Sequence, residues 1–110
     1  MPQQKLRKTL LKTGDLILDL EKTTLNKGST TFHLTPKETM IMALLMNNVG
    51  QIVSRDELMK EVWHTNDGLG NSRTLDVHIR WLRQKIEDDP NIPEYILTRR
   101  SLGYELRIRS

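Results

Sequence analysis

The segment that decides the fold is Arg73-Thr-Leu-Asp-Val-His-Ile-Arg-Trp-Leu-Arg-Gln-Lys-Ile86, because at 100° per residue it divides into two helix faces of different chemistry. One face is an apolar stripe, made of Leu75, Ile79, Leu82 and Ile86. The opposite face carries cations, hydrogen-bonding groups and two apolar side chains, namely Arg73, Thr74, Val77, Arg80, Trp81 and Gln84. The pattern predicts a helix that packs through the stripe and presents its other face to a partner.

The arginines of the outer face favour a nucleic-acid partner. A guanidinium presents a planar fork of donors that fits phosphate oxygens and guanine edges, whereas ordinary solvated helix faces mix lysine and glutamate. Asp76 lies three residues after Arg73 and four before Arg80, so intrahelical pairing is a second role for these arginines. The two roles are compatible, and we expect Asp76 to orient both side chains.

Length and composition predict one domain with a modest core. The chain has 110 residues, of which 36% are hydrophobic, and it has no cysteine, which excludes disulfides and cysteine-bound zinc. Residues 1–14 contain four basic and no acidic residues, residues 15–70 contain five basic and eight acidic residues, and residues 71–110 contain eight basic and six acidic residues. Such asymmetry suits a body that offers one positive face to a polyanion. No apolar run reaches membrane-spanning length and no signal peptide opens the chain, so we expect a soluble cytoplasmic protein without a membrane partner.

The order of the predicted elements gives the fold class. Residues 1–14 are basic and aperiodic, and they predict a linker or flexible arm before a domain at residues 15–109. Alternating residues from Leu16 to Leu34 predict an antiparallel meander. Capping boxes at Thr35 and Ser54 predict two helices, and the third helix begins near Ser72 and ends near Glu87. Period-two residues from Tyr95 predict a C-terminal hairpin with the basic tip Arg99-Arg-Ser-Leu-Gly103. This is an α+β layout in which the third helix is followed by a β-wing.

Catalysis is not expected. The three histidines, His33, His64 and His78, lack metal-ligand spacing and fall in different elements, and Gly68-Leu-Gly70 lacks the third glycine of a dinucleotide site. No serine or acidic pair comes with a recognisable base. We therefore predict a protein that is not an enzyme and that needs no metal or cofactor.

Several separated motifs occur together in a recognisable order. They are Leu34-Thr-Pro-Lys-Glu38, Val53-Ser-Arg-Asp-Glu-Leu58 with Val62-Trp63, the third-helix segment Arg73 to Lys85, and Thr98-Arg-Arg-Ser-Leu-Gly-Tyr104. With these motifs, residues 15–109 resemble the OmpR/PhoB-type winged-helix effector domain of two-component response regulators. The resemblance implies a winged helix-turn-helix with a four-stranded N-terminal sheet, three helices and a C-terminal hairpin wing. It also implies sequence-specific binding of duplex DNA.

The resemblance also implies the binding residues. It assigns Arg73, Thr74, Val77, His78, Arg80 and Arg83 to the helix in the major groove, Trp63 to a backbone contact, and Thr98, Arg99 and Arg100 to the wing. For His78, a packed histidine bonded to backbone is an alternative. Trp81 departs from the family pattern, in which many relatives have a basic residue. An exposed tryptophan here would contact thymine methyls or sugars, or would form part of a protein interface.

The partners follow from the same resemblance. It implies tandem binding to direct-repeat promoter sites, a receiver domain in the same protein with its histidine kinase, and contact with RNA polymerase. The polymerase contact would use the loop between the second and third helices, which comprises His64, Thr65, Asn66, Asp67, Gly68, Leu69 and Gly70. The alternative function is a winged helix used for protein binding through the Trp81 face. A basic groove would favour DNA, and an apolar patch without positive potential would favour protein.

Overall fold

The computed structural model describes residues 9–64 and 72–108, which form three helices and seven strands in two sheets. Their order along the chain is β1 (Leu10–Thr13), β2 (Leu16–Asp19), β3 (Thr24–Lys27), β4 (Thr30–His33), α2 (Pro36–Asn47), β5 (Ile52–Ser54), α3 (Arg55–Trp63), α4 (Ser72–Ile86), β6 (Ile96–Arg99) and β7 (Gly103–Leu106). None of these helices combines the length and the apolarity that crossing a bilayer requires.

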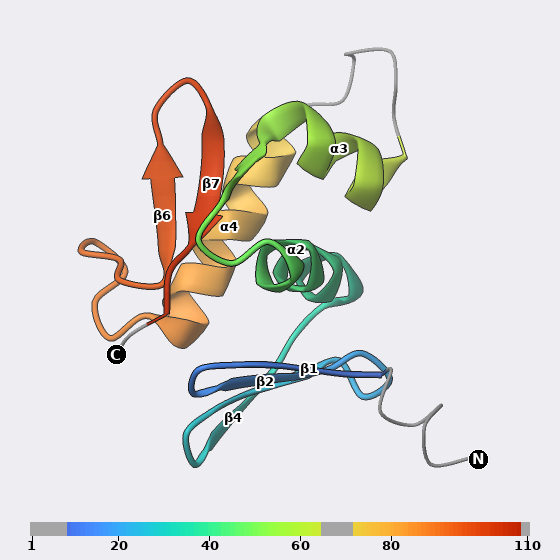
Figure 1. Cartoon of the computed structure of the whole chain (residues 1–110), viewed down its shortest axis with the longest axis vertical. Coiled ribbons are helices and arrows are strands. Elements are labelled where there is room, and N and C mark those ends of the chain that lie inside the picture. Colours follow the sequence, from blue (N-terminus) through green and yellow to red (C-terminus); the bar gives the residue numbers. More distant parts are fainter. Residues whose placement is uncertain (1–8, 65–71, 109–110) are drawn as a thin grey trace.

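The elements form layers (Figure 1). The four-stranded sheet β1-β2-β3-β4, drawn in blue to teal, lies at one end of the molecule next to α2, and α3 lies on the far side of α2. The hairpin β6-β7, drawn in red, stands beside α4. Helix α2 contacts β1 and β2 on one side and α3, α4 and β7 on the other. The two sheets therefore never meet through a common strand, and the helical layer joins them.

Helix α2 begins at the predicted capping box, which is confirmed. The Thr35 hydroxyl accepts the Glu38 backbone N–H at 3.2 Å, and Glu38 Oε1 accepts the Thr35 N–H at 2.9 Å. The Glu38 carboxylate is fully buried, and it also accepts from Lys85 Nζ of α4 at 2.6 Å. Lys85 in turn donates to the His33 carbonyl at 3.0 Å. This ion pair thus fixes the start of α2 against α4 and against the end of β4.

The N-terminal sheet begins earlier than the sequence pattern predicted. Residues 10–13 form β1, which pairs antiparallel with β2 from Leu10↔Asp19 to Thr13↔Leu16. The prediction of a flexible arm over residues 1–14 is therefore wrong for this segment, because β2 would otherwise leave one row of backbone groups unpaired. Residues 1–8 of the predicted arm lie outside the described residues. The sequence pattern did not predict this strand, because its side chains are exposed or half-buried and do not alternate clearly between apolar and polar.

The wing belongs to a three-stranded sheet of order β5-β7-β6, whereas the sequence pattern predicted only a hairpin. Strand β5 immediately precedes α3 and pairs with β7 in the register Ile52↔Glu105 to Ser54↔Gly103. Only three residues long, β5 gives too little alternation to be recognised. Tyr104 and Leu106 of β7 are buried, in agreement with the period-two pattern that predicted this strand. The β5 pairing places the start of α3 beside the base of the wing.

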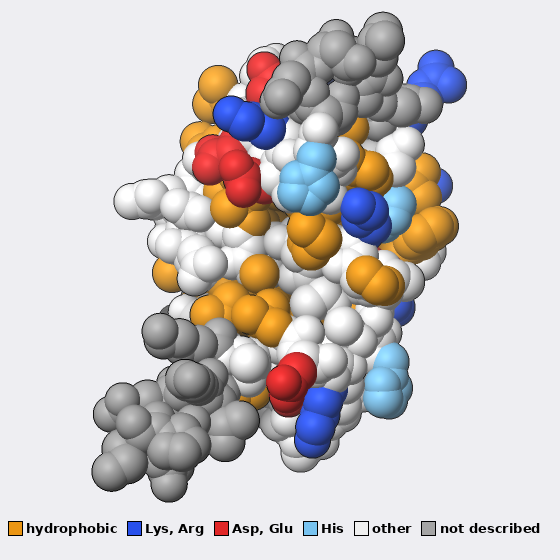
Figure 2. Space-filling view, turned by 90° about the vertical axis from the view of Figure 1, so that its right-hand side faces the viewer, with side chains coloured by type: hydrophobic (Ala, Val, Ile, Leu, Met, Phe, Trp, Pro, Cys, Tyr) orange, Lys and Arg blue, Asp and Glu red, His pale blue; other side chains and the backbone are white. Residues whose placement is uncertain are grey.

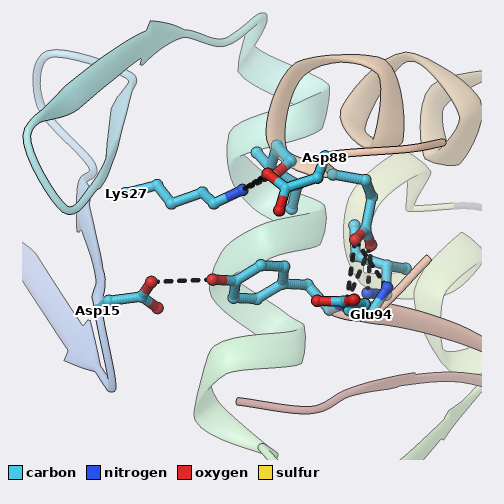
Figure 3. A network of polar contacts seen from close by, with 8 residues as sticks. Asp15, Lys27, Asp88 and Glu94 are labelled. Atoms are coloured by element: carbon cyan, nitrogen blue, oxygen red, sulfur yellow. Dashed lines mark hydrogen bonds and ion pairs between the residues drawn. The ribbon is translucent and has the colours of Figure 1, made fainter. Parts of the chain in front are cut away.

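A polar network joins the four-stranded sheet to the C-terminal end of α4 (Figure 3). Lys27, at the end of β3, donates to the Ile86 carbonyl at 2.6 Å and to Asp88 Oδ1 at 3.0 Å. The Lys27 ammonium also lies 5.0 Å from the centre of the Tyr95 ring, and the Tyr95 hydroxyl donates to Asp15 Oδ2 at 2.8 Å. A cation at the last carbonyls of a helix is favourable, because those carbonyls lack partners within the helix.

The connection from α4 to β6 turns around a buried carboxylate. Glu87, which is 6% exposed, accepts the backbone N–H groups of Glu94, Tyr95 and Ile96 at 2.8–3.2 Å. Three backbone donors at the start of the wing are satisfied by one side chain that directly follows the helix. The direction in which the wing leaves α4 is therefore set by Glu87.

The close pairing of β5 and β7 predicts that adding a methyl group at Gly103 lowers the stability of the fold. This glycine has φ +149°, and a Cβ atom would lie 2.0 Å from the Val53 carbonyl oxygen. We expect Gly103→Ala to lower the free energy of unfolding by at least about 2 kcal/mol, because strain and a clash with β5 combine. Gly28→Ala is the matched control, since Gly28 has φ +60° with open space around it and should cost about 1 kcal/mol. Equal urea-melt midpoints for the two variants would contradict the close β5-β7 approach.

A second prediction concerns the carboxylate of Glu87. Glu87→Gln replaces one acceptor oxygen by an amide NH₂ that faces backbone donors, so we expect a loss of about 1–3 kcal/mol in the free energy of unfolding. Glu21→Gln removes the same charge from an exposed turn, and should change stability by less than about 0.5 kcal/mol. The measurement is a urea melt of each variant at neutral pH. A Glu87→Gln protein as stable as the wild type would disprove this role.

Candidate nucleic-acid interface

The two faces of α4 separate as the sequence pattern predicted. All four stripe residues, Leu75, Ile79, Leu82 and Ile86, are at most 1% exposed. On the opposite face Arg73, Arg80, Trp81 and Gln84 are exposed, while Thr74 and Val77 are half-buried. Helix α4 thus packs into the core through its apolar stripe, while Arg73, Arg80, Trp81 and Gln84 remain accessible.

The predicted DNA-binding residues lie on α4, on the wing, or where α3 ends. Those that are exposed are Arg73, Arg80, Trp81, Thr98 and Arg100, and those that are half-buried are Trp63, Thr74, Val77, His78, Arg83 and Arg99. Of the predicted loop, His64 is exposed and ends α3 in the left-handed conformation, with φ 57°. Thr65 to Gly70 lie outside the described residues.

Three aromatic rings form a row from the end of α3 across α4. The His78 ring packs edge-on against Trp63, with centroids 5.1 Å apart, and against Trp81 at 4.9 Å with an interplanar angle of 53°. His78 Nδ1 lies 2.7 Å from the Thr74 carbonyl oxygen, so this nitrogen carries the donated hydrogen. The packed alternative weighed for His78 is therefore found. The Lys37 ammonium lies 5.6 Å from the centre of the Trp63 ring, at the end of this row, and donates to the Val62 carbonyl.

Asp76 connects α4 to α3 and to the wing. Its Oδ1 atom pairs with Arg55 NH1 at 2.9 Å and accepts the Tyr104 hydroxyl at 2.6 Å. Arg55 NH1 also lies 3.4 Å from the Tyr104 hydroxyl oxygen. The sequence pattern had assigned Asp76 to the arginines of its own helix, and this assignment missed its contacts to two other elements. The β5-β7 pairing brings Arg55 and Tyr104 to the carboxylate.

The charges in this cluster stabilise one another. Burial alone would raise the pKa of Asp76, but the hydrogen bonds from Arg55 and Tyr104 and the charges of Arg55 and Arg80 outweigh it, so the pKa is lowered. Burial and the hydrogen bond to Asp76 raise the pKa of Tyr104, so its hydroxyl remains a donor at neutral pH. The hydrogen bond to Asp76 raises the pKa of Arg55 further above its usual value. At neutral pH Asp76 and Arg55 are therefore both charged and paired with each other, and Tyr104 remains a neutral donor.

Arg83 holds the wing against α4. Its guanidinium donates to the Ile96 carbonyl through Nε at 3.0 Å and NH2 at 2.7 Å, and NH2 also donates to the Thr98 hydroxyl at 2.8 Å. The guanidinium carbon lies 5.8 Å from the centre of the Tyr104 ring. Burial lowers the pKa of Arg83 below its usual value. Most donors of this arginine are thus used inside the protein, and its main structural role is to orient β6.

The wing tip leaves one arginine pointing to solvent. Arg99 Nε pairs with Glu105 Oε1 across the hairpin at 2.7 Å, whereas Arg100 is exposed in the turn between β6 and β7. Ser101 in this turn has φ 68°, a left-handed conformation that lets the hairpin reverse in three residues. The positive charge of the tip therefore resides mainly on Arg100.

A polar groove of about 470 Å³ separates α4 from the wing. Its lining comes from α4, from β7 and from the connection after α4, and consists of Asp76, Arg80, Arg83, Gln84, Pro90, Asn91 and Tyr104. A second hollow of about 230 Å³ lies between α2 and α3 and is lined mainly by apolar side chains, with no arginine or lysine. Figure 2 shows one face of the molecule, on which hydrophobic side chains form patches between a few charged and histidine side chains. The polar groove and the apolar hollow have no lining residue in common and are separate features.

Sequence reasoning missed Arg55, Tyr104, Lys37 and Asn91 as parts of this surface. Arg55 and Tyr104 come together only through a strand pairing between residues about fifty positions apart, for which a single sequence carries no local signal. Arg55 could have been noticed as a cation inside the second capping box. Among the described residues, no three His, Cys, Asp or Glu side chains are grouped in a way that could hold a metal ion.

Known proteins with similar sequences include transcriptional regulators. Residues 29–106 match the family model described as "Transcriptional regulatory protein, C terminal". The alkaline phosphatase synthesis transcriptional regulatory protein SphR of Synechococcus elongatus is 48% identical over 73 residues, which are 66% of this chain and 28% of that protein. A probable transcriptional regulator of Cyanidium caldarium is 41% identical over 102 residues, which are 89% of this chain and 41% of that protein. The chain thus spans less than half the length of these relatives.

Two solved structures share the fold over nearly the whole chain. The response regulator DrrB of Thermotoga maritima, described as an OmpR/PhoB homologue, superimposes with a TM-score of 0.77 at 33% identity, covering 96% of this chain and 47% of that one. The DNA-binding domain of RstA from Klebsiella pneumoniae, solved in complex with the RstA box, gives a TM-score of 0.76 at 30% identity, covering 89% and 96%. With the wing, the capped helices and the exposed face of α4 in place, the chain belongs to the family of C-terminal domains of transcriptional regulatory proteins, the OmpR/PhoB-type winged-helix domains of response regulators.

Proposed function

We propose that this domain binds duplex DNA sequence-specifically, with α4 in the major groove and the wing over the adjacent backbone and minor groove. The observation that carries the proposal is the accessible face of α4, on which Arg73 and Arg80 are exposed opposite a fully buried stripe. A helix with its side chains is about 10–12 Å wide, which fits a major groove about 12 Å wide. The related RstA domain was solved with its DNA box, which supports the same use here.

The groove between α4 and the wing suits one strand of the DNA backbone. Arg80, Gln84 and Asn91 line it with donors, and Arg100 is exposed at the wing tip. Phosphate contacts of this kind set the register of a protein on the duplex, while the side chains of the helix read base edges. Asp76 would repel phosphate if it were free, but it is paired with Arg55 and Tyr104. In this proposal Trp63 and His78 contact the backbone at the groove edge, Arg73, Thr74 and Val77 face the bases, and Thr98 and Arg99 support Arg100.

The wider role of the domain is part of the proposal. Because the curated relatives are more than twice as long, we infer that the domain acts as the effector of a cytoplasmic two-component response regulator. A receiver domain controlled by a histidine kinase, tandem binding to direct repeats, and contact of residues 64–70 with RNA polymerase belong to this role. Selection of bound duplexes from a random pool tests the tandem arrangement, since half-sites should recur about one helical turn apart.

The proposal predicts the salt dependence of binding. With about four to six phosphate contacts per domain, the slope of log K against log salt concentration should be about −4 to −5. The measurement is fluorescence anisotropy of a selected duplex at several salt concentrations, with heparin as the competitor control. A slope near zero, or equal affinity for heparin and for the selected duplex, would contradict sequence-specific DNA binding and favour the protein-binding alternative.

Two arginines on neighbouring turns of α4 should behave differently. Arg80→Ala should weaken binding of the selected duplex by about 1–3 kcal/mol, because it removes an exposed cation from the proposed interface. It should change the free energy of unfolding by less than about 0.5 kcal/mol. Arg83→Ala should instead destabilise the fold by about 1–3 kcal/mol, because the Ile96 carbonyl and the Thr98 hydroxyl lose their donor.

Binding titrations and urea melts of both variants separate these roles. The affinity is compared per folded molecule, so that a loss of stability is not counted as a loss of contact. If Arg80→Ala leaves the affinity unchanged while the fold is intact by circular dichroism, the proposed DNA face is wrong.

A further inference from the structure

Trp81 is the one large apolar side chain on the accessible face of α4. It is 42% exposed, between Arg80 and the core residue Leu82. Seven and four residues earlier on the same side of the helix lie Thr74 and Val77, both half-buried. Val77 and Trp81 form an apolar strip along a face whose other members, Arg73, Thr74, Arg80 and Gln84, are polar.

The Trp81 ring is held in place before any partner arrives. It packs 4.9 Å from the His78 ring, and His78 is fixed by its hydrogen bond to the Thr74 carbonyl and by its edge-on contact with Trp63. Trp63 packs against the hydrophobic core and lies beneath the Lys37 ammonium. An aromatic ring supported in this way loses little side-chain freedom when it is covered, so its contact area is available for binding.

The chemistry of the indole limits what this ring can recognise on DNA. Its only polar group is one N–H donor and it has no acceptor, so it cannot donate in bidentate fashion to guanine O6 and N7. Nor can it pair as a cation with phosphate. The one apolar group that a base displays in the major groove is the C5-methyl of thymine.

We infer that Trp81 is a specificity-determining residue that selects operator sequences by packing against a thymine C5-methyl group. The inference rests on the proposed function, and it names the base feature that the apolar strip of α4 reads. Burying one methyl group against the ring should favour thymine over the same base without its methyl group by about three- to fivefold in affinity. The contact adds no charge, so it should not alter the salt dependence of binding.

The experiment removes single methyl groups from the DNA. A duplex obtained by selection from a random pool is resynthesised with deoxyuridine in place of each thymine in turn, which deletes the methyl and keeps every hydrogen-bonding group. We expect one or two substitutions to weaken the wild type about three- to fivefold and to have no effect on Trp81→Ala. Trp81→Phe should retain part of the discrimination. Leu10→Ala is the matched control, because Leu10 is similarly exposed, at 47%, but lies in the four-stranded sheet.

The outcomes separate the two levels of the proposal. If Trp81→Ala keeps the full deoxyuridine penalty at every sensitive thymine, or if no thymine is sensitive in the wild type, the methyl-reading role is wrong while DNA binding stands. If the wild type selects no duplex, the proposed function fails and this inference fails with it. Thermal melts of each variant show that the compared proteins are folded.

Discussion

The whole arrangement depends on the burial of α2. Four of its apolar side chains, Ile41, Met42, Leu45 and Met46, are almost fully buried, so the helix needs cover on more than one side. The four-stranded sheet provides it on one side, and α3, α4 and β7 provide it on the other. Because α4 must give its apolar stripe to this core, only its polar face is left for a partner. The interface is thus a consequence of how the core is closed.

Inside that core one ion pair restricts how α2 and α4 can lie relative to each other. The Glu38 carboxylate is fully buried and is bound both by its own capping box and by Lys85. A buried carboxylate left without its partner is costly, which restricts α2 and α4 to relative positions that keep the pair. Apolar contacts alone tolerate sliding between helices. This pair therefore helps to define which residues of α4 face outward.

Local patterns in the sequence predicted the helices and the exposed face of α4 well, but they did not predict contacts between residues far apart in the chain. The stripe of α4 and the caps of α2 and α3 are encoded within a few residues, so periodicity and cap chemistry found them. Strand β1 has weak alternation and β5 has three residues, so each is identified only through its partner strand. The same limit applied to the site. The resemblance assigned Arg83 to the helix face that enters the DNA major groove. Its hydrogen bonds to Ile96 and Thr98 arise only when the wing folds back onto α4.

The contacts at the two ends of α4 have a mechanical consequence. Near its start, Asp76 is tied to Arg55 of α3 and to Tyr104 of the wing sheet, and at its end the Ile86 carbonyl is tied to Lys27 of the four-stranded sheet. A rotation of α4 about its own axis would break polar contacts near both ends of the helix, with a different sheet at each end. The angular orientation of the exposed side chains of α4 is therefore set by polar contacts to both sheets.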